Sequence, residues 1–171
     1  MAKIYLIDVT NRDGVQTSRI GLAKLEKTLL NIKLNKMGGF RSEFGFPVTN
    51  HETNYLNANL ELAKMGVINP MVLSGWTRAI KQDVDAAFKN CPGIEHLNIS
   101  ISTSEQMIAG KFQGRRGKEE VVKEMVASLV HAKEKGAKTV GVNSEDASRT
   151  DIDYLIEFAT AAKNNGAATL R

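Results

Sequence analysis

A cluster of polar residues directly follows the first apolar run of the chain. Residues 4–7 are β-branched, aromatic or otherwise apolar, and Asp8, Arg12, Asp13 and Gln16 come after them. We interpret this pattern as a buried strand that runs into a loop. In such a loop Asp13 offers a hard oxygen ligand for a divalent metal, and Arg12 offers a fixed cation with several hydrogen-bond donors. Arg-Asp-Gly is equally compatible with a surface turn that carries an exposed ion pair.

The rest of the chain alternates predicted strands with predicted helices. A glycine at 38, 66, 136 and 166 follows a helix and precedes a strand each time, which is the usual composition of a helix-to-strand junction. Regular alternation predicts a parallel sheet, either doubly wound or closed into a barrel. The predicted strands cover residues 4–7, 39–45, 70–73, 96–102, 138–142 and 167–170, and the predicted helices cover 22–37, 50–64, 79–90, 118–135 and 151–164.

Composition places the chain among ordinary globular proteins. Its 171 residues, 42% hydrophobic and 25% charged, suffice for one domain but fall short of the roughly 250 residues of a complete (β/α)8 barrel. No apolar run approaches the roughly 18 residues of a membrane span, and no signal peptide precedes the first strand, so we expect a cytoplasmic protein without membrane contact. The single cysteine, Cys91, excludes an intrachain disulfide, and no suitable base adjoins it for nucleophilic catalysis.

The charge pattern favours a small anionic substrate over nucleic acid. The formal net charge is +4, which is compatible with a carboxylate or a coenzyme A phosphate as ligand. The densest basic cluster, at 111–118, holds one aromatic residue and is followed by two glutamates, so it lacks the stacking residues of a nucleic-acid surface.

Polar residues recur where the predicted strands end. The carboxyl ends of parallel strands meet at one edge of an α/β fold, and catalytic residues lie there. Repeated arginine and glutamate at these positions exceed what a turn requires and indicate an active site. No glycine-rich phosphate loop follows the first strand, which argues against a nucleotide-binding enzyme. The residues concerned are Asp8, Arg12, Asp13 and Gln16, then Glu43, then Ser74 and Arg78, then Ser100, Ser102 and Ser104, and lastly Asn143, Glu145 and Arg149.

Three motifs at these strand ends resemble one enzyme family. The stretch 8–16, Asp-Val-Thr-Asn-Arg-Asp-Gly-Val-Gln, is similar to the Asp-x-Thr-x-Arg-Asp-Gly-x-Gln signature of metal-dependent acyl-CoA condensing enzymes. Residues 43–47 are similar to the family's Glu-x-Gly-x-Pro, and residues 145–149 to its Glu-Asp-Ala-Ser-Arg. Asn11 and Val15 depart from the usual Leu and Glu. The resemblance covers the whole chain and implies the N-terminal portion of a TIM (β/α)8 barrel, about six strands and five helices in a single catalytic domain, 1–171, that stops before strand 7.

The resemblance also implies roles for the candidate residues. Arg12 would stabilise the developing enolate or the keto oxygen, and Glu43 would hold Arg12 or assist proton transfer. Asp13 would bind a divalent metal (Mg, Mn or Zn), and Gln16 would contact the keto acid. The remaining assignments to substrate binding are Arg78, Ser102 and Asn143. The expected reaction is a Claisen-type acyl transfer from acetyl-CoA to a 2-keto acid.

Within this family the sequence is most similar to the homocitrate synthases associated with nitrogenase and nitrogen fixation, notably over residues 100–106. This likeness implies 2-oxoglutarate as the keto acid. Gly141 and Asn143 stand where lysine-pathway homocitrate synthases have Arg and Ser, so 2-isopropylmalate synthase and citramalate synthase remain open. The family's His-x-His metal ligands belong to strand 7, and we assign no ligand role to His51, His96 or His131.

Two further alternatives remain. An aldolase or lyase on the same barrel would share the Arg12 and Asp13 chemistry. A non-catalytic partial-barrel subunit would instead bind a partner through exposed strand edges. We expect a homo-oligomer, or a second polypeptide that completes the barrel, and we expect residues 1–171 alone to be inactive.

Overall fold

The computed structural model describes residues 4–171, which form two compact units. The first unit runs to Trp76 and includes residues 86–96, and the second contains residues 77–85 and 97–171. Strands follow chain order, β1-β2-β3 and then β4-β5-β6. The pairings of β1 with β2, β2 with β3 and β5 with β6 are all parallel, as the alternating pattern predicts.

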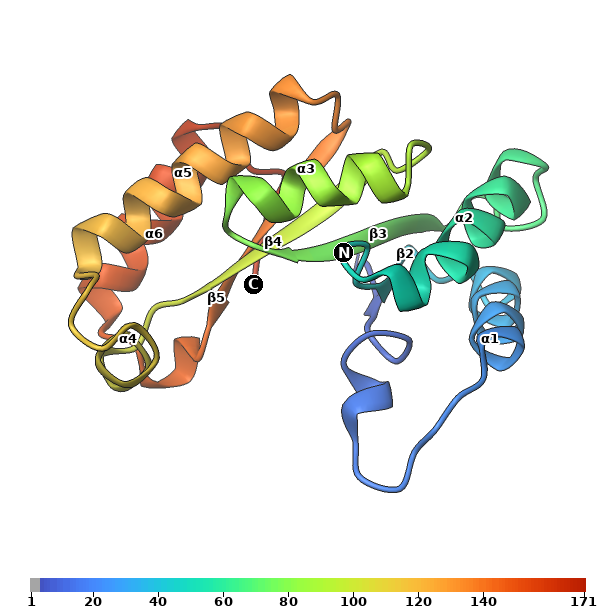
Figure 1. Cartoon of the computed structure of the whole chain (residues 1–171), viewed down its shortest axis with the longest axis horizontal. Coiled ribbons are helices and arrows are strands. Elements are labelled where there is room, and N and C mark those ends of the chain that lie inside the picture. The colour runs from blue at the N-terminus through green and yellow to red at the C-terminus, as the bar shows by residue number, and fades with distance from the viewer. Residues whose placement is uncertain (1–3) are drawn as a thin grey trace. The chain divides into compact units, whose positions relative to one another are not determined.

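The first unit places two helices against its strands (Figure 1). Its β2 is buried along its whole length, with Phe44 fully enclosed and Leu56 of the following helix packed in the same core. Both β3 and α3 contribute residues to the two units. The elements are β1 (Ile7–Asp8), a 3-10 turn (Gly14–Gln16), α1 (Lys24–Lys36), β2 (Arg41–Gly45), α2 (Asn50–Lys64), β3 (Val72–Arg78) and α3 (Lys81–Asn90).

In the second unit two long helices, α5 and α6, lie side by side over the strands (Figure 1). Met125 and Leu129 of α5 and Phe158 of α6 are fully buried, and α5 packs on β5. The elements are β4 (His96–Ser102), α4 (Glu105–Phe112), α5 (Lys118–Glu134), β5 (Thr139–Glu145), a 3-10 turn (Ala147–Arg149), α6 (Ile152–Asn164) and β6 (Thr169–Leu170). No helix of residues 4–171 is both long and apolar enough to cross a membrane.

The glycines at the helix-to-strand junctions behave as predicted. Gly38, Gly66, Gly136 and Gly166 have φ values of 85°, 81°, 102° and 84°. A side chain is strained in this left-handed region, so glycine is the residue that ends the helix and turns the chain into the next strand.

The prediction of a buried first strand at residues 4–7 is wrong. The strand is limited to Ile7–Asp8, and Ile4, Tyr5 and Leu6 are 83%, 53% and 73% exposed. Among the described residues β1 pairs with β2 alone, so its other edge and much of its side-chain surface are uncovered. Apolar composition predicted extended backbone here but could not predict which strand lies at an edge.

Two other strands are longer than predicted. Residues 74–78 belong to β3 and residues 143–145 to β5, rather than to the loops that follow. Gly75 lies beyond the predicted strand end at residue 73, and a Cβ at this position would lie 2.7 Å from Ile94 Cδ1 and 3.0 Å from Pro47 Cγ. Glycine therefore allows close packing inside the strand rather than ending it.

One helix was missed: α4 lies within the segment predicted as a loop. Ser104 is its N-cap, and the serine hydroxyl accepts a hydrogen bond from Met107 N at 3.2 Å. A serine followed by Glu105 in the first turn is a recognisable helix start, outweighed here by the basic residues that follow. The structure therefore has six α-helices among residues 4–171, not the five predicted.

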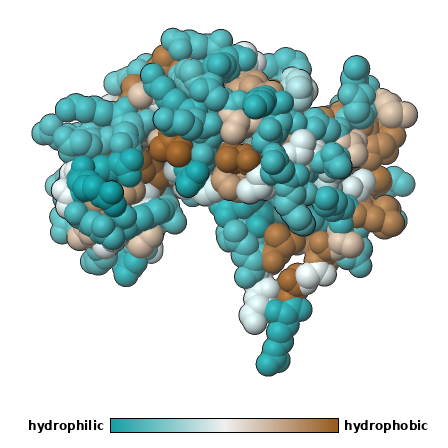
Figure 2. All heavy atoms as spheres, viewed as in Figure 1, coloured by the Kyte–Doolittle hydropathy of each residue, from teal (hydrophilic) through white to brown (hydrophobic). Residues whose placement is uncertain are grey.

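Helix α1 buries polar residues and exposes apolar ones, contrary to its apolar spacing. Lys27 and Asn31 are 5% and 0% exposed, whereas Leu25 and Leu29 are 69% and 48% exposed. Brown, hydrophobic residues accordingly appear on the surface over α1 and the C-terminal end of α2 (Figure 2). The buried face of α1 is polar because it meets a hydrogen-bonding side chain from the loop after β1.

Candidate active site

The loop after β1 is held by its own backbone. Val9 O accepts hydrogen bonds from the amides of Arg12, Asp13 and Gly14 at 3.1, 2.8 and 3.1 Å. The Asp8 carboxylate accepts from Thr10 N and Thr10 Oγ1, both at 3.0 Å. The signature motif therefore forms a compact turn, in which these backbone contacts limit where the Arg12 and Asp13 side chains can lie.

Asn11, at the position where the motif usually has Leu, anchors this turn to α1. It is fully buried, and its Nδ2 donates to Lys27 O and to Asn31 Oδ1, both at 2.9 Å. Sequence reasoning noted Asn11 only as a departure from the family pattern. Its buried partner Asn31, on α1, is also hydrogen-bonded to the side chains of Ser42, Tyr55 and Asn59.

Arg12 lies between a carboxylate pair and an aromatic ring. Its Nη1 donates to Asp13 Oδ1 at 2.8 Å, and its guanidinium carbon lies 4.3 Å from the ring centroid of Trp76. Its Nε is 3.5 Å from Glu43 Oε1, an ion pair that is too long to count as a hydrogen bond. The Arg12 and Glu43 side chains are 15% and 2% exposed, so the structure brings two of the predicted catalytic residues together in a largely dry setting.

The other two predicted residues of this loop are more exposed. The Asp13 side chain is 60% exposed, and Gln16 lies exposed on the 3-10 turn. Nowhere among residues 4–171 do three or more His, Cys, Asp or Glu side chains gather into a possible metal site. Asp13 fits a hard divalent cation as one carboxylate ligand, but the described residues do not complete a coordination shell around it.

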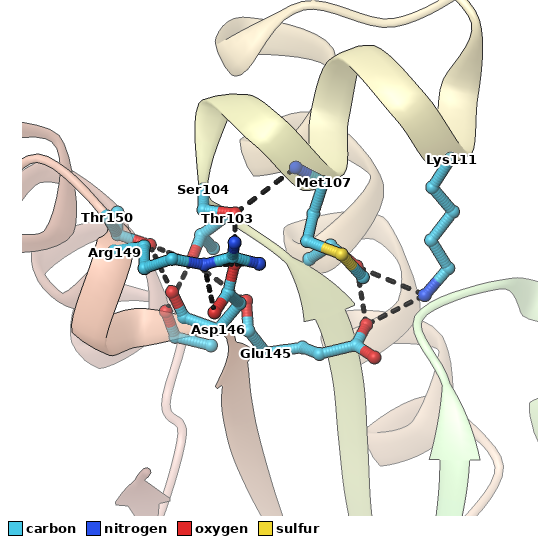
Figure 3. A network of polar contacts seen from close by, with 10 residues as sticks. Thr103, Ser104, Met107, Lys111, Glu145, Asp146, Arg149 and Thr150 are labelled. Carbon is cyan, nitrogen blue, oxygen red and sulfur yellow. Dashed lines mark hydrogen bonds and ion pairs between the residues drawn. The ribbon is translucent and has the colours of Figure 1, made fainter.

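The second unit carries its own group of polar residues at the ends of β4 and β5. Ser102 donates to Glu145 Oε2, and Lys111 Nζ donates to the same carboxylate at 2.7 Å and to Ser102 Oγ at 3.1 Å (Figure 3). Lys111 comes from α4, the helix that the sequence prediction missed. Its basic neighbours concealed the role of this lysine as the partner of Glu145.

Next to this group, Asp146 is fully engaged. It accepts from Arg149 Nε through both carboxylate oxygens at 2.8 and 2.9 Å and from Ser104 Oγ at 2.5 Å (Figure 3). The hydrogen bonds from Arg149, and then that from Ser104, lower the pKa of the Asp146 carboxyl below its usual range. Every member of this cluster is satisfied by another side chain.

The remaining predicted residues also lie in the second unit. Arg78 forms a two-point ion pair with the buried carboxylate of Asp83, Nε–Oδ2 and Nη2–Oδ1 both being 2.8 Å, and this raises the Arg78 pKa. Asn143 Nδ2 donates to Ser100 Oγ at 3.0 Å. A cavity of about 310 Å³ is lined by Arg78 and Ser102 together with Ser100, Lys111, Phe112 and Arg116, among others.

The comparisons with known proteins fit these motifs. The family model described as HMGL-like matches residues 3–171. The chain belongs to the HMGL-like family. A structural neighbour, the HMG-CoA lyase of Bacillus subtilis, has a TM-score of 0.71 at 17% identity over 98% of this chain and 57% of that one. This neighbour confirms the predicted fold, the N-terminal portion of a TIM barrel.

Among HMGL-like relatives, citrate (Re)-synthase of Dehalococcoides mccartyi strain CBDB1 is 63% identical over the whole chain and 41% of its own length. The 2-isopropylmalate synthase 2 of Caldanaerobacter subterraneus subsp. tengcongensis is 37% identical over 98% of this chain and 41% of its own length. The chain thus spans less than half the length of these relatives. The predicted kinship with 2-isopropylmalate synthases is confirmed, whereas the homocitrate assignment and the site residues stay predictions.

Proposed function

We propose that the protein carrying this chain is an acyltransferase that condenses acetyl-CoA with a 2-keto acid, and that the keto acid is oxaloacetate and the product citrate. The buried pair of Arg12 and Glu43 is the observation that carries the reaction class. The 63% identity to a citrate (Re)-synthase supports the choice of keto acid. Joining an acetyl unit to the keto carbon of oxaloacetate, with hydrolysis of the thioester, yields citrate and free coenzyme A.

Arg12 is suited to the step that makes the carbon–carbon bond. The acetyl methyl loses a proton, the resulting carbanion attacks the keto carbon, and the keto oxygen gains negative charge. A guanidinium fixed by Trp76 and Glu43 is already oriented and largely desolvated, so it stabilises that charge without reorganising. Glu43 pairs with Arg12 at 3.5 Å and would keep it in place, or would assist the return of a proton to the new hydroxyl.

A divalent metal is part of the proposal through one ligand only. Asp13 would supply a carboxylate to Mg²⁺, Mn²⁺ or Zn²⁺, and a bound metal would polarise the keto carbonyl as a Lewis acid. Arg12 pairs with the same carboxylate at 2.8 Å, so it limits the positions that Asp13 can take.

Substrate binding is proposed for the cavity of the second unit. Arg78 and Ser102 line it, and Asn143 is hydrogen-bonded to Ser100, which lines it too. Apolar walls, including Ile80 and Phe112, together with cationic groups suit a ligand that joins an apolar part to an anionic part, as acetyl-CoA does. In the first unit, Gln16 is proposed to contact the keto acid.

Homocitrate formation from 2-oxoglutarate is the second candidate, favoured by the wording of residues 100–106. Gly141 argues against the arginine-bearing version of that site. A Cβ at this position would lie 2.6 Å from Thr169 Oγ1 and 2.7 Å from Asn98 Oδ1, so any side chain would have to displace both. An arginine at position 141 would therefore require Asn98 and Thr169 to move.

The test is release of free coenzyme A by the full-length protein with Mg²⁺ or Mn²⁺. Oxaloacetate, 2-oxoglutarate, 2-oxoisovalerate and pyruvate are compared as acceptors. We expect release with oxaloacetate and loss of release in Arg12→Ala and Asp13→Ala. Release with 2-oxoglutarate alone would establish the homocitrate alternative. No release with any keto acid would favour a lyase, or the non-catalytic partial-barrel subunit.

A further inference from the structure

Among residues 4–171, two buried N–H donors of the first unit make no hydrogen bond. Trp76 Nε1 and Arg12 Nε have no hydrogen-bond partner within the described part of the chain, residues 4–171. A buried N–H that is left unpaired costs roughly 1–3 kcal/mol, so such groups are uncommon in folded proteins and call for an explanation. Here both donors belong to side chains that touch each other.

The contact between them is a stacked pair. The Arg12 guanidinium lies 4.3 Å from the Trp76 ring centroid, within the range of a cation–π interaction. Phe46 supports the indole edge-on, with centroids 5.3 Å apart and an interplanar angle of 62°. The indole is therefore fixed from β3, and it restricts the orientation of the guanidinium.

Trp76 was not among the residues predicted from the sequence, because residues 74–78 were read as a loop. As part of β3 it lies on a strand whose neighbour, β2, carries Glu43; Glu43 and Ser74 are paired in register. Ser74 Oγ is another buried polar atom without a hydrogen-bond partner among residues 4–171. Donors that make no hydrogen bond at Ser74 and Trp76, two positions apart on β3, and at Arg12 suggest a ligand with several acceptor oxygens.

We propose that Trp76 binds the keto acid: its indole N–H donates to a carboxylate oxygen, while its ring face holds Arg12 against the keto group. This inference rests on the proposed function. A carboxylate has several lone pairs and meets N–H donors from different directions. It would therefore accept hydrogen bonds from Trp76 Nε1 and from Arg12 Nε, which make none among the described residues and of which Arg12 Nε has only the long 3.5 Å ion-pair contact with Glu43.

Two substitutions separate the two roles of the indole. Trp76→Phe keeps an aromatic face for Arg12 and removes the N–H, and Trp76→Leu removes both. We expect Trp76→Phe to raise the KM for oxaloacetate by about tenfold to a hundredfold, the usual value of a hydrogen bond to a charged group, with kcat and the KM for acetyl-CoA little changed. Trp76→Leu should in addition lower kcat, because Arg12 is no longer held.

Tyr154→Leu is the matched control. Tyr154 is a buried aromatic whose ring lies 5.2 Å from Lys118 Nζ, so its loss removes an aromatic–cation contact in the second unit. We expect a loss of stability in this variant without a rise in the KM for oxaloacetate.

A binding measurement keeps this inference separate from the reaction. Trp76 is the only tryptophan of the chain, so oxaloacetate added without acetyl-CoA should change an emission component that Trp76→Phe lacks. Calorimetry should show weaker oxaloacetate binding in the same variant. Equal affinity in wild type and Trp76→Phe would overturn the inference, even if coenzyme A is released. If the wild type released no coenzyme A but still bound oxaloacetate more tightly than Trp76→Phe, only the proposed reaction would be contradicted.

Discussion

Arg12 in the first unit and Arg149 in the second each pair with an aspartate on the same loop or turn, and these two pairs differ in their surroundings. Arg12 lies 2.8 Å from Asp13, and Arg149 lies 2.7 Å from Asp146. The Arg12 side chain is 15% exposed and stacked on Trp76, whereas the Arg149 side chain is 55% exposed. Ion-pair distance alone therefore does not distinguish the two arginines. Burial, an aromatic neighbour and an Nε that makes no hydrogen bond distinguish Arg12.

The largest expected difference between the two pairs is in kcat when each arginine is changed separately to lysine. Arg12→Lys keeps the charge but loses the planar donors that stack and point several ways, and we expect kcat for coenzyme A release to fall about a hundredfold to a thousandfold. Arg149→Lys should change kcat by no more than about threefold, because exposed ion pairs contribute little. Steady-state rates with saturating acetyl-CoA measure both, and circular dichroism controls for folding. Similar losses in the two variants would contradict the distinction.

The two units also differ in how polar residues are buried. Asn31 is fully buried and exchanges hydrogen bonds of 2.9–3.0 Å with Asn11, Ser42, Tyr55 and Asn59. In the second unit the half-buried Thr150 shares a hydrogen bond of 2.7 Å with the fully buried Thr103. The side-chain amide of Asn31 therefore has four hydrogen-bonding side chains around it, whereas the hydroxyl of Thr150 has fewer partners.

Asn31→Leu should therefore be more damaging than Thr150→Val. Replacing Asn31 leaves several buried groups without partners, and we expect a loss of about 2–4 kcal/mol in the free energy of unfolding. The loss for Thr150→Val should be about 1 kcal/mol. Urea titrations followed by circular dichroism give both values. Asn31→Leu should also lower kcat, since Asn11 anchors the loop that carries Arg12; a stable and fully active variant would show that the loop is held by its backbone alone.

Local patterns in the sequence predicted most of the fold. The helices at 50–64 and 118–135 and the strand at 96–102 match the observed elements to within a residue, because a run of helical or alternating spacing ends at a capping residue or a glycine. The strand at 70–73 was predicted too short, because the packing of Gly75 against Pro47 and Ile94 joins residues far apart in the chain. The polar buried face of α1 could not be predicted for the same reason, since it depends on the contact of α1 with Asn11.

The sequence predicted only those candidate site residues that stand in a motif or at the end of a predicted strand. Arg12 and Glu43 were predicted, since both stand in recognisable motifs, and the structure brings their side chains to 3.5 Å. The sequence did not draw attention to Trp76 or Lys111, because what sets them apart is the side chain that each one contacts. A tryptophan in sequence gives no sign of stacking on an arginine 64 positions earlier. Tertiary contacts, rather than residue type, supply that information.

The smallest expected effect concerns pH and the Asp146 cluster. Hydrogen bonds from Arg149 and Ser104 lower the Asp146 pKa below the usual value of about 3.9. A carboxylate with a lowered folded-state pKa contributes stability above its unfolded pKa and loses that contribution as the pH falls through the folded value. We therefore expect wild type to exceed Asp146→Asn slightly in urea midpoint from neutral pH down to about pH 4, with the difference shrinking at lower pH.

Salt separates the charge effect from the hydrogen bonds. Asp146 and Arg149 pair near the surface, so added salt should narrow the same difference at neutral pH. Arg12→Lys offers the contrast, because its effect on kcat arises at a buried, stacked group and should persist in the same salt. If the Asp146→Asn difference stayed constant down to pH 3 and in salt, the charge of the Asp146 carboxylate would not contribute to stability. The expected contrast between this pair and the buried Arg12 pair would then be contradicted.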